Sequence, residues 1–275
     1  MHVFYLNGNF ISADVAAIDP QDRGFLLGDG VFTTIRIESG FPCHLALHWE
    51  RLQTSAQRLK LKFTLDLITL KNLITTLLAH NNLSSQTASL RITLTRGNGS
   101  RGLLPPEIQQ PTLLITCAPL PQYSETFSVY LSDFRRNEYS SLSQIKTLNY
   151  LDNIMARCEA QEHGADEALL LNTQAKVVCG SMSNLFVVIN HKVYTASIRE
   201  GVLPGVMRSI VLQFLQQLNI TVVESAISAA QIIQAEEMFL TNALMGIKPV
   251  IAINHQAINQ GEIGAITKKL QQLVS

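Results

Sequence analysis

The chain has 275 residues, of which 47% are hydrophobic and 15% charged, and its formal net charge is zero. This length allows one large domain or two modest ones. A neutral chain offers no basic surface to nucleic acid or to an anionic membrane. No apolar run approaches the length of a membrane span, and the first residues lack the pattern of a secretory signal. The four cysteines form no CxxC pair, which suits a reducing compartment. We therefore expect a soluble, cytoplasmic protein.

The first half of the chain predicts strands and helices that alternate with turns. Asn7-Gly8 lies between two short apolar runs and is a strong hairpin signal. The segment 19–30 is rich in turn-forming residues and precedes a strand over 31–37. Apolar residues recur at helical spacing over 45–59 and 67–78, and alternate with polar residues in a strand over 88–94. A further strand is predicted over 112–117.

A proline-rich stretch then divides the chain. Ala118-Pro119-Leu120-Pro121 is typical of an extended linker, because proline stiffens the backbone. We expect a smaller N-terminal α+β domain over 1–118, a linker over 119–122, and a larger C-terminal α/β domain over 123–275. A ligand would then be expected at the interface of the two domains.

The stretch from 144 to 186 contains the most informative lysine. Lys146 immediately precedes a periodic helix, whose apolar positions lie between 148 and 158, and Gly164 follows as a C-cap signal. Two apolar strands are predicted over 168–171 and 187–189. A lysine packed between a strand and a helix is desolvated, which lowers its pKa and makes its amine nucleophilic. The alternative is that Lys146 is an ordinary solvated side chain.

The remaining elements are a helix, a strand and a terminal helix. The helix opens at 203–208, and its first backbone N–H groups are free donors at the positive end of the helix dipole. The strand over 238–240 ends in a loop of small and polar residues at 241–246. A helix over 261–274 closes the chain.

The sequences KTLNYLDN, GADEALLLN and SNLF, in this order after position 145, resemble the fold-type IV, pyridoxal-phosphate-dependent family, also called class IV aminotransferases. The family comprises branched-chain aminotransferases, D-amino-acid aminotransferases and 4-amino-4-deoxychorismate lyases. The resemblance covers nearly the whole chain, including the D-R-G-x-x-x-G-D-G segment at 22–30. It implies a two-domain α+β fold like that of D-amino-acid aminotransferase, pyridoxal 5'-phosphate (PLP) as cofactor, and a homodimer.

The resemblance also implies roles for individual residues. Lys146 would hold the cofactor covalently. Arg51, in an H-x-x-R-L motif, would bind the cofactor phosphate, because a planar guanidinium suits a phosphate dianion; the alternative is a solvated helix arginine. Val206 and Met207 would bind the phosphate through their backbone amides. Asn149, expected one residue inside the helix, would contact the cofactor's phenolic oxygen or, alternatively, the local backbone.

The loop after the strand at 238–240 separates the subfamilies. Asn242, Ala243, Leu244 and Met245 resemble the N-[AS]-L-M of the lyases, whereas the aminotransferases usually have T-G-T or S-S-T residues there. The first two would contact the cofactor and the last two the substrate. Arg101, in the glycine-rich loop 96–102, could close over an anionic substrate or remain solvated.

One residue departs from the family pattern. The family signature has a glutamate five residues before Asn184, where its carboxylate keeps the pyridine nitrogen of the cofactor protonated, and this chain has Cys179. A thiol with a reference pKa of about 8.5 is mostly neutral near pH 7. A weaker electron sink should harm transamination more than a lyase step that ends in an aromatic ring.

The favoured function is therefore 4-amino-4-deoxychorismate lyase, which makes 4-aminobenzoate and pyruvate for folate synthesis. Lys146 would act there as general base and then as general acid. The alternatives are a D-amino-acid or branched-chain aminotransferase, and a catalytically weakened PLP-binding protein. No metal is expected.

Overall fold

The computed structural model describes residues 2–274, which form two compact units. The first comprises Met1–Gln122 and Ile145–Asn149, and the second comprises Tyr123–Gln144 and Tyr150–Ser275. The short segment Ile145–Asn149 therefore packs with the first unit, although it lies beyond the proline-rich stretch. Within 2–274, no helix has both the length and the apolar character that a membrane crossing requires.

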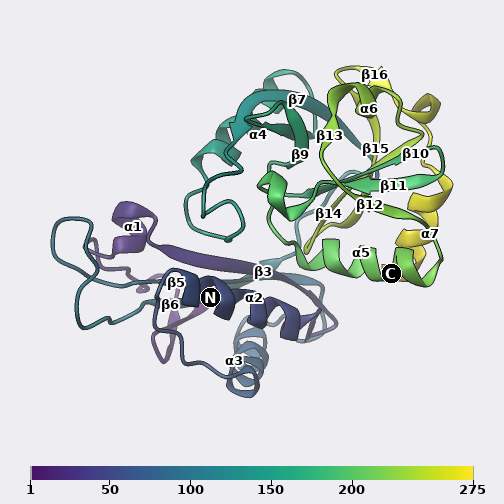
Figure 1. The fold of residues 1–275 in the computed structure, drawn as a ribbon. Coiled ribbons are helices and arrows are strands. Elements are labelled where there is room, and N and C mark those ends of the chain that lie inside the picture. The colour runs from purple at the N-terminus through teal and green to yellow at the C-terminus, as the bar shows by residue number, and fades with distance from the viewer. Residues whose placement is uncertain (1, 275) are drawn as a thin grey trace. The chain divides into compact units, whose positions relative to one another are not determined.

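The first unit contains a six-stranded sheet in the order β2-β1-β6-β5-β3-β4 (Figure 1). All its pairings are antiparallel. The strands are β1 (Val3–Leu6), β2 (Asn9–Ser12), β3 (Gly30–Glu38), β4 (Phe41–Pro42), β5 (Ala88–Thr95) and β6 (Leu113–Pro119). Asn7 and Gly8 both have positive φ, as the predicted Asn-Gly turn requires. The hairpin and the predicted strands of this half are confirmed, and β6 extends two residues beyond its predicted end.

Two amphipathic helices, α2 (Leu45–Arg58) and α3 (Leu67–His80), cover one face of this sheet. Asp66 caps α3 by accepting from the Thr69 backbone N–H at 2.9 Å. The helices bury their apolar stripes against alternate residues of β3 and β5, including Val31, Ile35 and Leu90. The predicted turn at 19–30 also contains a short helix, α1 (Arg23–Leu27), which ends at Gly28 with φ of 66°.

The second unit contains a ten-stranded sheet in the order β12-β11-β10-β14-β15-β7-β8-β9-β13, with β16 paired to β15. Its strands are β7 (Phe127–Arg136), β8 (Glu167–Asn172), β9 (Lys176–Gly180), β10 (Asn184–Ile189), β11 (Lys192–Thr195), β12 (Val222–Glu224), β13 (Ile227–Ser228), β14 (Glu237–Asn242), β15 (Gly246–Ile253) and β16 (Gln256–Ala257). A further pairing joins β9 to β10. This pairing closes the six strands β10, β14, β15, β7, β8 and β9 into a ring.

Helices pack outside this ring. They are α4 (Leu151–Glu162), α5 (Val206–Gln217), α6 (Ala229–Ile233) and α7 (Ala265–Val274), with short 3-10 turns at Ile198–Glu200 and Asn259–Gly261. Helices α5 and α7 cover a face built around Phe186 and Phe239, whose rings stack with centroids 4.9 Å apart. The final helix begins four residues later than predicted. The mixed α+β architecture agrees with the predicted fold class.

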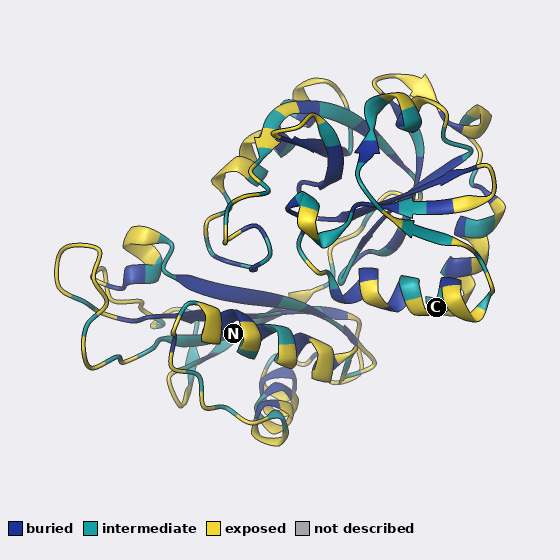
Figure 2. Cartoon of the chain, viewed as in Figure 1, coloured by how far each residue is buried: buried dark blue, intermediate teal, exposed yellow. Residues whose placement is uncertain are grey.

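Helix α4 differs from the expectation in two respects. It begins at Leu151, so Asn149 precedes the helix and does not lie inside it. Its predicted apolar stripe is also exposed, because Leu151 and Ile154 retain 69% and 54% of their accessible surface, whereas the small Ala156 and Ala160 face the core. Figure 2 shows this contrast between buried strands and exposed helix surfaces. The helical spacing of apolar residues therefore predicted that α4 is a helix, but it did not predict which face of α4 is buried.

Candidate active site

Lys146 belongs to a segment that continues the antiparallel pairing of β3. The Phe32 backbone N–H donates to the Lys146 carbonyl at 2.9 Å, and Leu148 donates to Gly30 at 3.0 Å. These two bonds flank Thr147 and fix the backbone from the Lys146 carbonyl to Leu148. The Lys146 Nζ atom lies 4.3 Å from the centre of the Phe32 ring, a distance typical of a cation–π contact. The lysine is thus held against the aromatic face of Phe32.

A buried polar group lies on the opposite side of β3, facing α2. The Thr33 hydroxyl is 2.8 Å from His48 Nδ1 and accepts from Arg51 Nη2 at 3.0 Å. Burial, together with the positive charges of Arg51, His44 and Lys146, lowers the pKa of His48 to about 3. His48 is therefore neutral at physiological pH. It helps to hold the Thr33 hydroxyl that orients Arg51.

The sequence reasoning missed Arg91 of β5. Its guanidinium carbon lies 3.7 Å from the centre of the same Phe32 ring that Lys146 approaches, and its Nε donates to Thr93 at 3.0 Å. Thr34 pairs directly with Arg91 across β3 and β5. Alternation within 88–94 could have placed Arg91 on the polar face of the sheet, but the pairing of β5 with β3 was not evident from the sequence.

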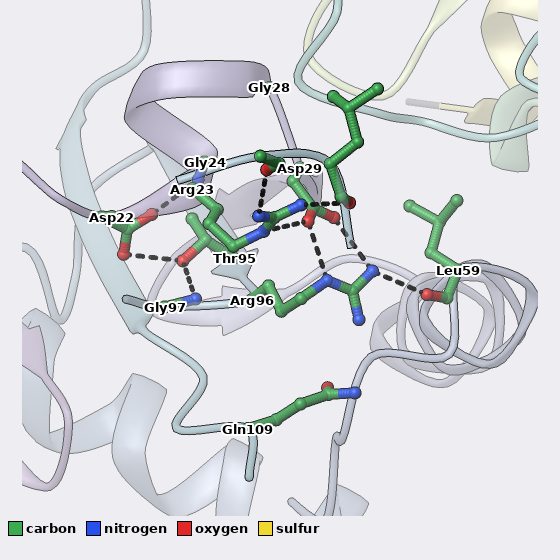
Figure 3. Close-up of polar contacts among 12 residues, drawn as sticks. Asp22, Arg23, Gly24, Gly28, Asp29, Leu59, Thr95, Arg96, Gly97 and Gln109 are labelled. Atoms are coloured by element: carbon green, nitrogen blue, oxygen red, sulfur yellow. Dashed lines mark hydrogen bonds and ion pairs between the residues drawn. The ribbon is translucent and has the colours of Figure 1, made fainter. Parts of the chain in front are cut away.

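The glycine-rich loop after β5 is anchored by a buried ion cluster (Figure 3). Asp29 accepts from Arg96 Nε at 2.7 Å and from Arg23 Nε at 2.9 Å. Burial tends to raise the pKa of Asp29, but the two arginines outweigh it and hold that pKa below its ordinary value. Arg96 is thereby committed to Asp29 and to the Leu59 carbonyl. Arg101, in contrast, is exposed.

The second unit presents the start of α5, where Gly205 is the N-cap and no side chain caps the helix. Asn184 fixes the preceding turn, because its Nδ2 donates to the Leu203 carbonyl at 2.9 Å. A Cβ atom added to Gly205 would lie 2.1 Å from Asn184 Oδ1, so only glycine permits this approach. Val206 and Met207 are the first residues of the helix. Their backbone amides are therefore available as donors for an anion.

Cys179 lies in apolar surroundings next to this turn. It pairs directly with Asn184 across β9 and β10 and packs in a cluster that includes Leu170 and Val178. Burial raises the pKa of the thiol; Arg136 opposes this rise and Glu167 adds to it. The thiol is therefore neutral, and it cannot supply the carboxylate charge that the family pattern has at this position.

Asn242 shapes the loop that follows β14. Its Oδ1 accepts from the backbone N–H groups of Leu244 and Met245 at 3.0 and 2.9 Å, and its Nδ2 lies 3.4 Å from the Met182 carbonyl. The side chain is thus used to close the turn at 242–245. Ala243 lies in that turn and is half-buried.

Comparison with known proteins places these features in a family. A model of amino-transferase class IV matches residues 30–253. The chain is 33% identical to a putative branched-chain-amino-acid aminotransferase of Methanocaldococcus jannaschii, over 98% of this chain and 93% of the relative. It is 27% identical to the aminodeoxychorismate lyase of Bacillus subtilis, with the same two coverages. A putative 4-amino-4-deoxychorismate lyase structure from Legionella pneumophila superposes with a TM-score of 0.87 at 29% identity, covering 95% of this chain and 96% of that one.

The α+β fold and the family match define a class of PLP-dependent enzymes of fold-type IV. Within that class, this chain belongs to the class IV aminotransferase family. The relatives include both aminotransferases and a lyase, so family membership does not distinguish the two reactions.

The residues present fit PLP in two of three respects. In the first unit, Lys146 has an amine of the kind that bonds an aldehyde carbon, and Arg51 has a guanidinium that suits a phosphate. In the second unit, the start of α5 has no side-chain cap, so its backbone N–H groups suit an anion. At the ring nitrogen, the residue assigned by the family pattern is the neutral thiol of Cys179. The chain therefore has the chemical groups that suit the cofactor's aldehyde and phosphate, and departs from the family pattern at position 179.

Proposed function

We propose that this chain is a 4-amino-4-deoxychorismate lyase, which converts its substrate to 4-aminobenzoate and pyruvate. The observation that carries the proposal is the buried neutral thiol of Cys179. Without a carboxylate to protonate the ring nitrogen, PLP is a weaker electron sink. Loss of pyruvate creates an aromatic ring, so the lyase reaction has a driving force that transamination lacks. The Asn242-Ala243-Leu244-Met245 sequence supports the same assignment.

The lyase reaction needs one group that can move a proton twice. PLP supplies the electron sink for the pair released when the ring C–H bond breaks. We assign the Lys146 amine as the general base that takes this proton. The C–O bond to the enolpyruvyl group then breaks and the ring becomes aromatic. Lys146 returns the proton to the departing enolate carbon, which gives pyruvate, so the lysine ends in its starting protonation state.

Binding roles are proposed for residues of each unit. In the first, Arg51 holds the cofactor phosphate and is itself oriented by Thr33. Asn149 donates to the Gly28 carbonyl at 3.1 Å, so its amide is fixed for a contact with the phenolic oxygen. In the second, the amides of Val206 and Met207 bind the phosphate, and the loop at Asn242 and Ala243 borders the cofactor.

The substrate carries two carboxylates, which require cationic partners. Arg91 shares the Phe32 ring with Lys146, and we propose that it binds one carboxylate near the reacting lysine. Arg101 is proposed to bind the substrate from the glycine-rich loop, and Leu244 and Met245 to contact its ring. Met245 itself packs in the apolar cluster that includes Leu185 and Leu240.

We also infer that the protein is a homodimer. Exposed apolar surface commonly marks an interaction site. The apolar stripe of α4 is exposed, as are Leu103 and Leu104, which retain 82% and 85% of their accessible surface. The cytoplasmic location expected from the cysteine usage stays a prediction.

An aminotransferase is the second candidate. It is favoured by the 33% identity to the putative branched-chain aminotransferase. A PLP-binding protein with weakened catalysis is the third, because Cys179 lowers the capacity of the electron sink. The three candidates differ in product: 4-aminobenzoate, a 2-oxo acid, or neither.

Two measurements test the proposal. Purified protein loaded with PLP is incubated with aminodeoxychorismate, and chromatography should show 4-aminobenzoate and pyruvate in equal amounts. The same preparation is assayed with D-alanine and with branched-chain amino acids, where turnover should be much slower. Faster turnover of an amino acid than of aminodeoxychorismate would contradict the lyase proposal and favour an aminotransferase.

Borohydride reduction then tests the lysine. It should fix a phosphopyridoxyl group on the peptide that contains Lys146. Label on another lysine, such as the exposed Lys71, would overturn the assignment of Lys146.

A further inference from the structure

The glycine-rich loop after β5 is built against the side chain of Arg23, a buried residue of α1 that is 4% exposed. Its Nη1 and Nη2 atoms donate to the carbonyls of Gly102 and Leu103 at 3.0 and 2.9 Å. Its backbone N–H donates to the Gly97 carbonyl at 2.9 Å. A Cβ atom added to Gly99 would lie 2.7 Å from Arg23 Cδ, so the loop backbone lies directly on the arginine stem there. Arg23 therefore contacts the loop at four residues.

Asp29 fixes the direction of these hydrogen bonds (Figure 3). Arg23 Nε donates to the Asp29 carboxylate at 2.9 Å. Because a guanidinium is planar, binding of Nε to Asp29 sets where the two Nη atoms point, and both bind loop carbonyls. A lysine has a single nitrogen and cannot bind the carboxylate and both carbonyls in this geometry. The loop conformation at 102–103 thus depends on an arginine at position 23.

Arg101, the proposed substrate-binding residue of this loop, directly precedes the two carbonyls. Residues 101–104 are exposed, so burial of side chains contributes little to the stability of this part of the loop. Segments with few buried contacts open more readily than the rest of a fold. Hydrogen bonds from a charged donor are stronger than those between neutral groups. The two bonds from Arg23 therefore restrain the backbone that carries Arg101.

We propose that Arg23 is a positioning residue for substrate binding, which holds the backbone of Arg101 so that this exposed guanidinium can bind a substrate carboxylate. The inference rests on the proposed role of Arg101. A cation that is already ordered loses less conformational entropy when it binds, so loss of Arg23 weakens substrate binding and leaves cofactor binding unchanged. Aminodeoxychorismate and amino acids both carry a carboxylate, and the inference is the same for a lyase and an aminotransferase.

Limited proteolysis tests whether Arg23 holds the loop. Full-length protein loaded with PLP is treated with trypsin, and mass spectrometry follows cleavage of the peptide bond between Arg101 and Gly102. Arg23→Lys keeps the charge opposite Asp29 but removes both carbonyl contacts. Arg96→Lys is the matched control, because Arg96 is similarly buried and also binds Asp29, but its Nη atoms bind the two carbonyls that follow α2.

The expected result is selective exposure of one peptide bond. Arg23→Lys should be cleaved after Arg101 about tenfold faster than wild type, because hydrogen bonds from a charged donor are lost. Arg96→Lys should be cleaved there at close to the wild-type rate. Gly99→Ala is a second variant, which does not place a lysine in the buried cluster. Its added Cβ atom would press on the Arg23 stem, so it should also accelerate cleavage.

A double-mutant cycle then tests whether Arg23 acts through Arg101. KM and kcat for aminodeoxychorismate are measured for wild type, Arg23→Lys, Arg101→Ala and the double variant. Each single substitution should raise KM about tenfold and leave kcat and the PLP dissociation constant near their wild-type values. The double variant should have the KM of Arg101→Ala, since Arg23 has no further effect once its target is absent. A residue that only stabilised the fold would have the same effect with and without Arg101.

The proposal is overturned if neither Arg23→Lys nor Gly99→Ala accelerates cleavage after Arg101, or if the two KM effects multiply in the double variant. A wild-type KM in Arg101→Ala also overturns it, because Arg23 would then have no substrate-binding residue to position. Failure of the proposed function has a different signature, since wild type then forms no 4-aminobenzoate. In that case the cycle is measured with the amino acid that the enzyme turns over. Without any turnover, it is measured as the dissociation constant of aminodeoxychorismate, read from the cofactor absorbance.

Discussion

The candidate site residues of the two units differ in charge: those of the first unit are cationic and those of the second are neutral. In the first, cations lie on both faces of β3: Lys146 and Arg91 share the Phe32 ring on one face, and Arg51 donates to the buried Thr33 hydroxyl on the other. In the second, the corresponding position is neutral, with a buried thiol at Cys179. In the proposed site, the first unit would therefore supply charge for anions, and the second would supply backbone dipoles and shape.

The contrast shows how burial acts on groups that have partners and on groups that lack them. Asp29 is half-buried between two arginines and stays ionised, because the ion pairs outweigh the cost of burial. Cys179 is fully buried in apolar surroundings, and Arg136 does not offset the burial that raises its pKa. At Asp29, the two arginine contacts compensate the cost of burying the charge.

The largest expected effect comes from removing a cation of the first unit. Arg51→Ala should weaken PLP binding by one to two decades, since a charge-assisted hydrogen bond contributes roughly 1.5–3 kcal/mol. Arg58→Ala, at an exposed position near the end of the same helix, is the control and should leave the dissociation constant unchanged. Equal constants for wild type and Arg51→Ala would make Arg51 a structural residue and would weaken the contrast between the units.

The second prediction concerns His48, which we expect to be neutral although it lies among cations of the first unit. The pKa of His48 is about 3 in the fold and about 6.5 when unfolded. The unfolded chain therefore binds more protons between these values, and the stability contributed by neutral His48 is present above pH 6.5 and is lost as the pH falls. From pH 7 to pH 5 the loss is about 2 kcal/mol.

The measurement is the melting temperature at the two pH values for wild type and for His48→Asn, whose amide can replace Nδ1 as an acceptor for Thr33. Wild type should lose about 4–8 °C more than the variant. Asp29 does not interfere, because its lowered pKa moves its titration below this window. Equal losses in both proteins would show that His48 is already protonated in the fold.

The sequence predicted local turns and helices better than the tertiary contacts that these elements make. The turn at Asn7-Gly8, the helices α2 and α3 and the start of α5 follow from local patterns, because each depends on neighbouring residues. The buried face of α4 did not follow, since its small alanines face the core and its large apolar residues are exposed. Apolar residues at helical spacing show that a helix has an apolar face. They do not show whether that face packs against the helix's own unit or against another surface.

The candidate site shows the same limit. Lys146 and Cys179 were selected from the order of motifs along the chain, and their roles remain proposals. Arg91 was missed because its position beside Phe32 depends on the pairing of β5 with β3. This pairing connects residues that are far apart in the sequence. Such a residue is identified by a contact between distant parts of the chain, and a local sequence pattern does not contain that information.

The smallest expected effect comes from placing a charge at the neutral position 179 of the second unit. This change is also the most direct test of the difference in charge between the two units. Cys179→Glu should raise the pKa of the bound cofactor's ring nitrogen, because an anionic neighbour favours the protonated form, at about 1.4 kcal/mol per pKa unit. Arg136 would favour the new carboxylate and Glu167 would oppose it, as they already do for the thiol. Transamination of D-alanine should then increase, and the lyase rate should change less, since aromatisation drives that reaction.

Cys179→Ser is the matched control, because it is neutral, nearly isosteric and should leave the ratio of the two rates unchanged. Glutamate is larger than cysteine, so the variant must first be shown to hold cofactor, by absorbance and at matched occupancy. The pH dependence of that absorbance reports the protonation of the ring directly. If Cys179→Glu binds PLP but neither the absorbance titration nor the rate ratio differs from that of Cys179→Ser, position 179 does not contact the ring nitrogen. The neutral thiol would then say nothing about the electron sink, and the choice between lyase and aminotransferase would rest on the loop at 242–245 alone.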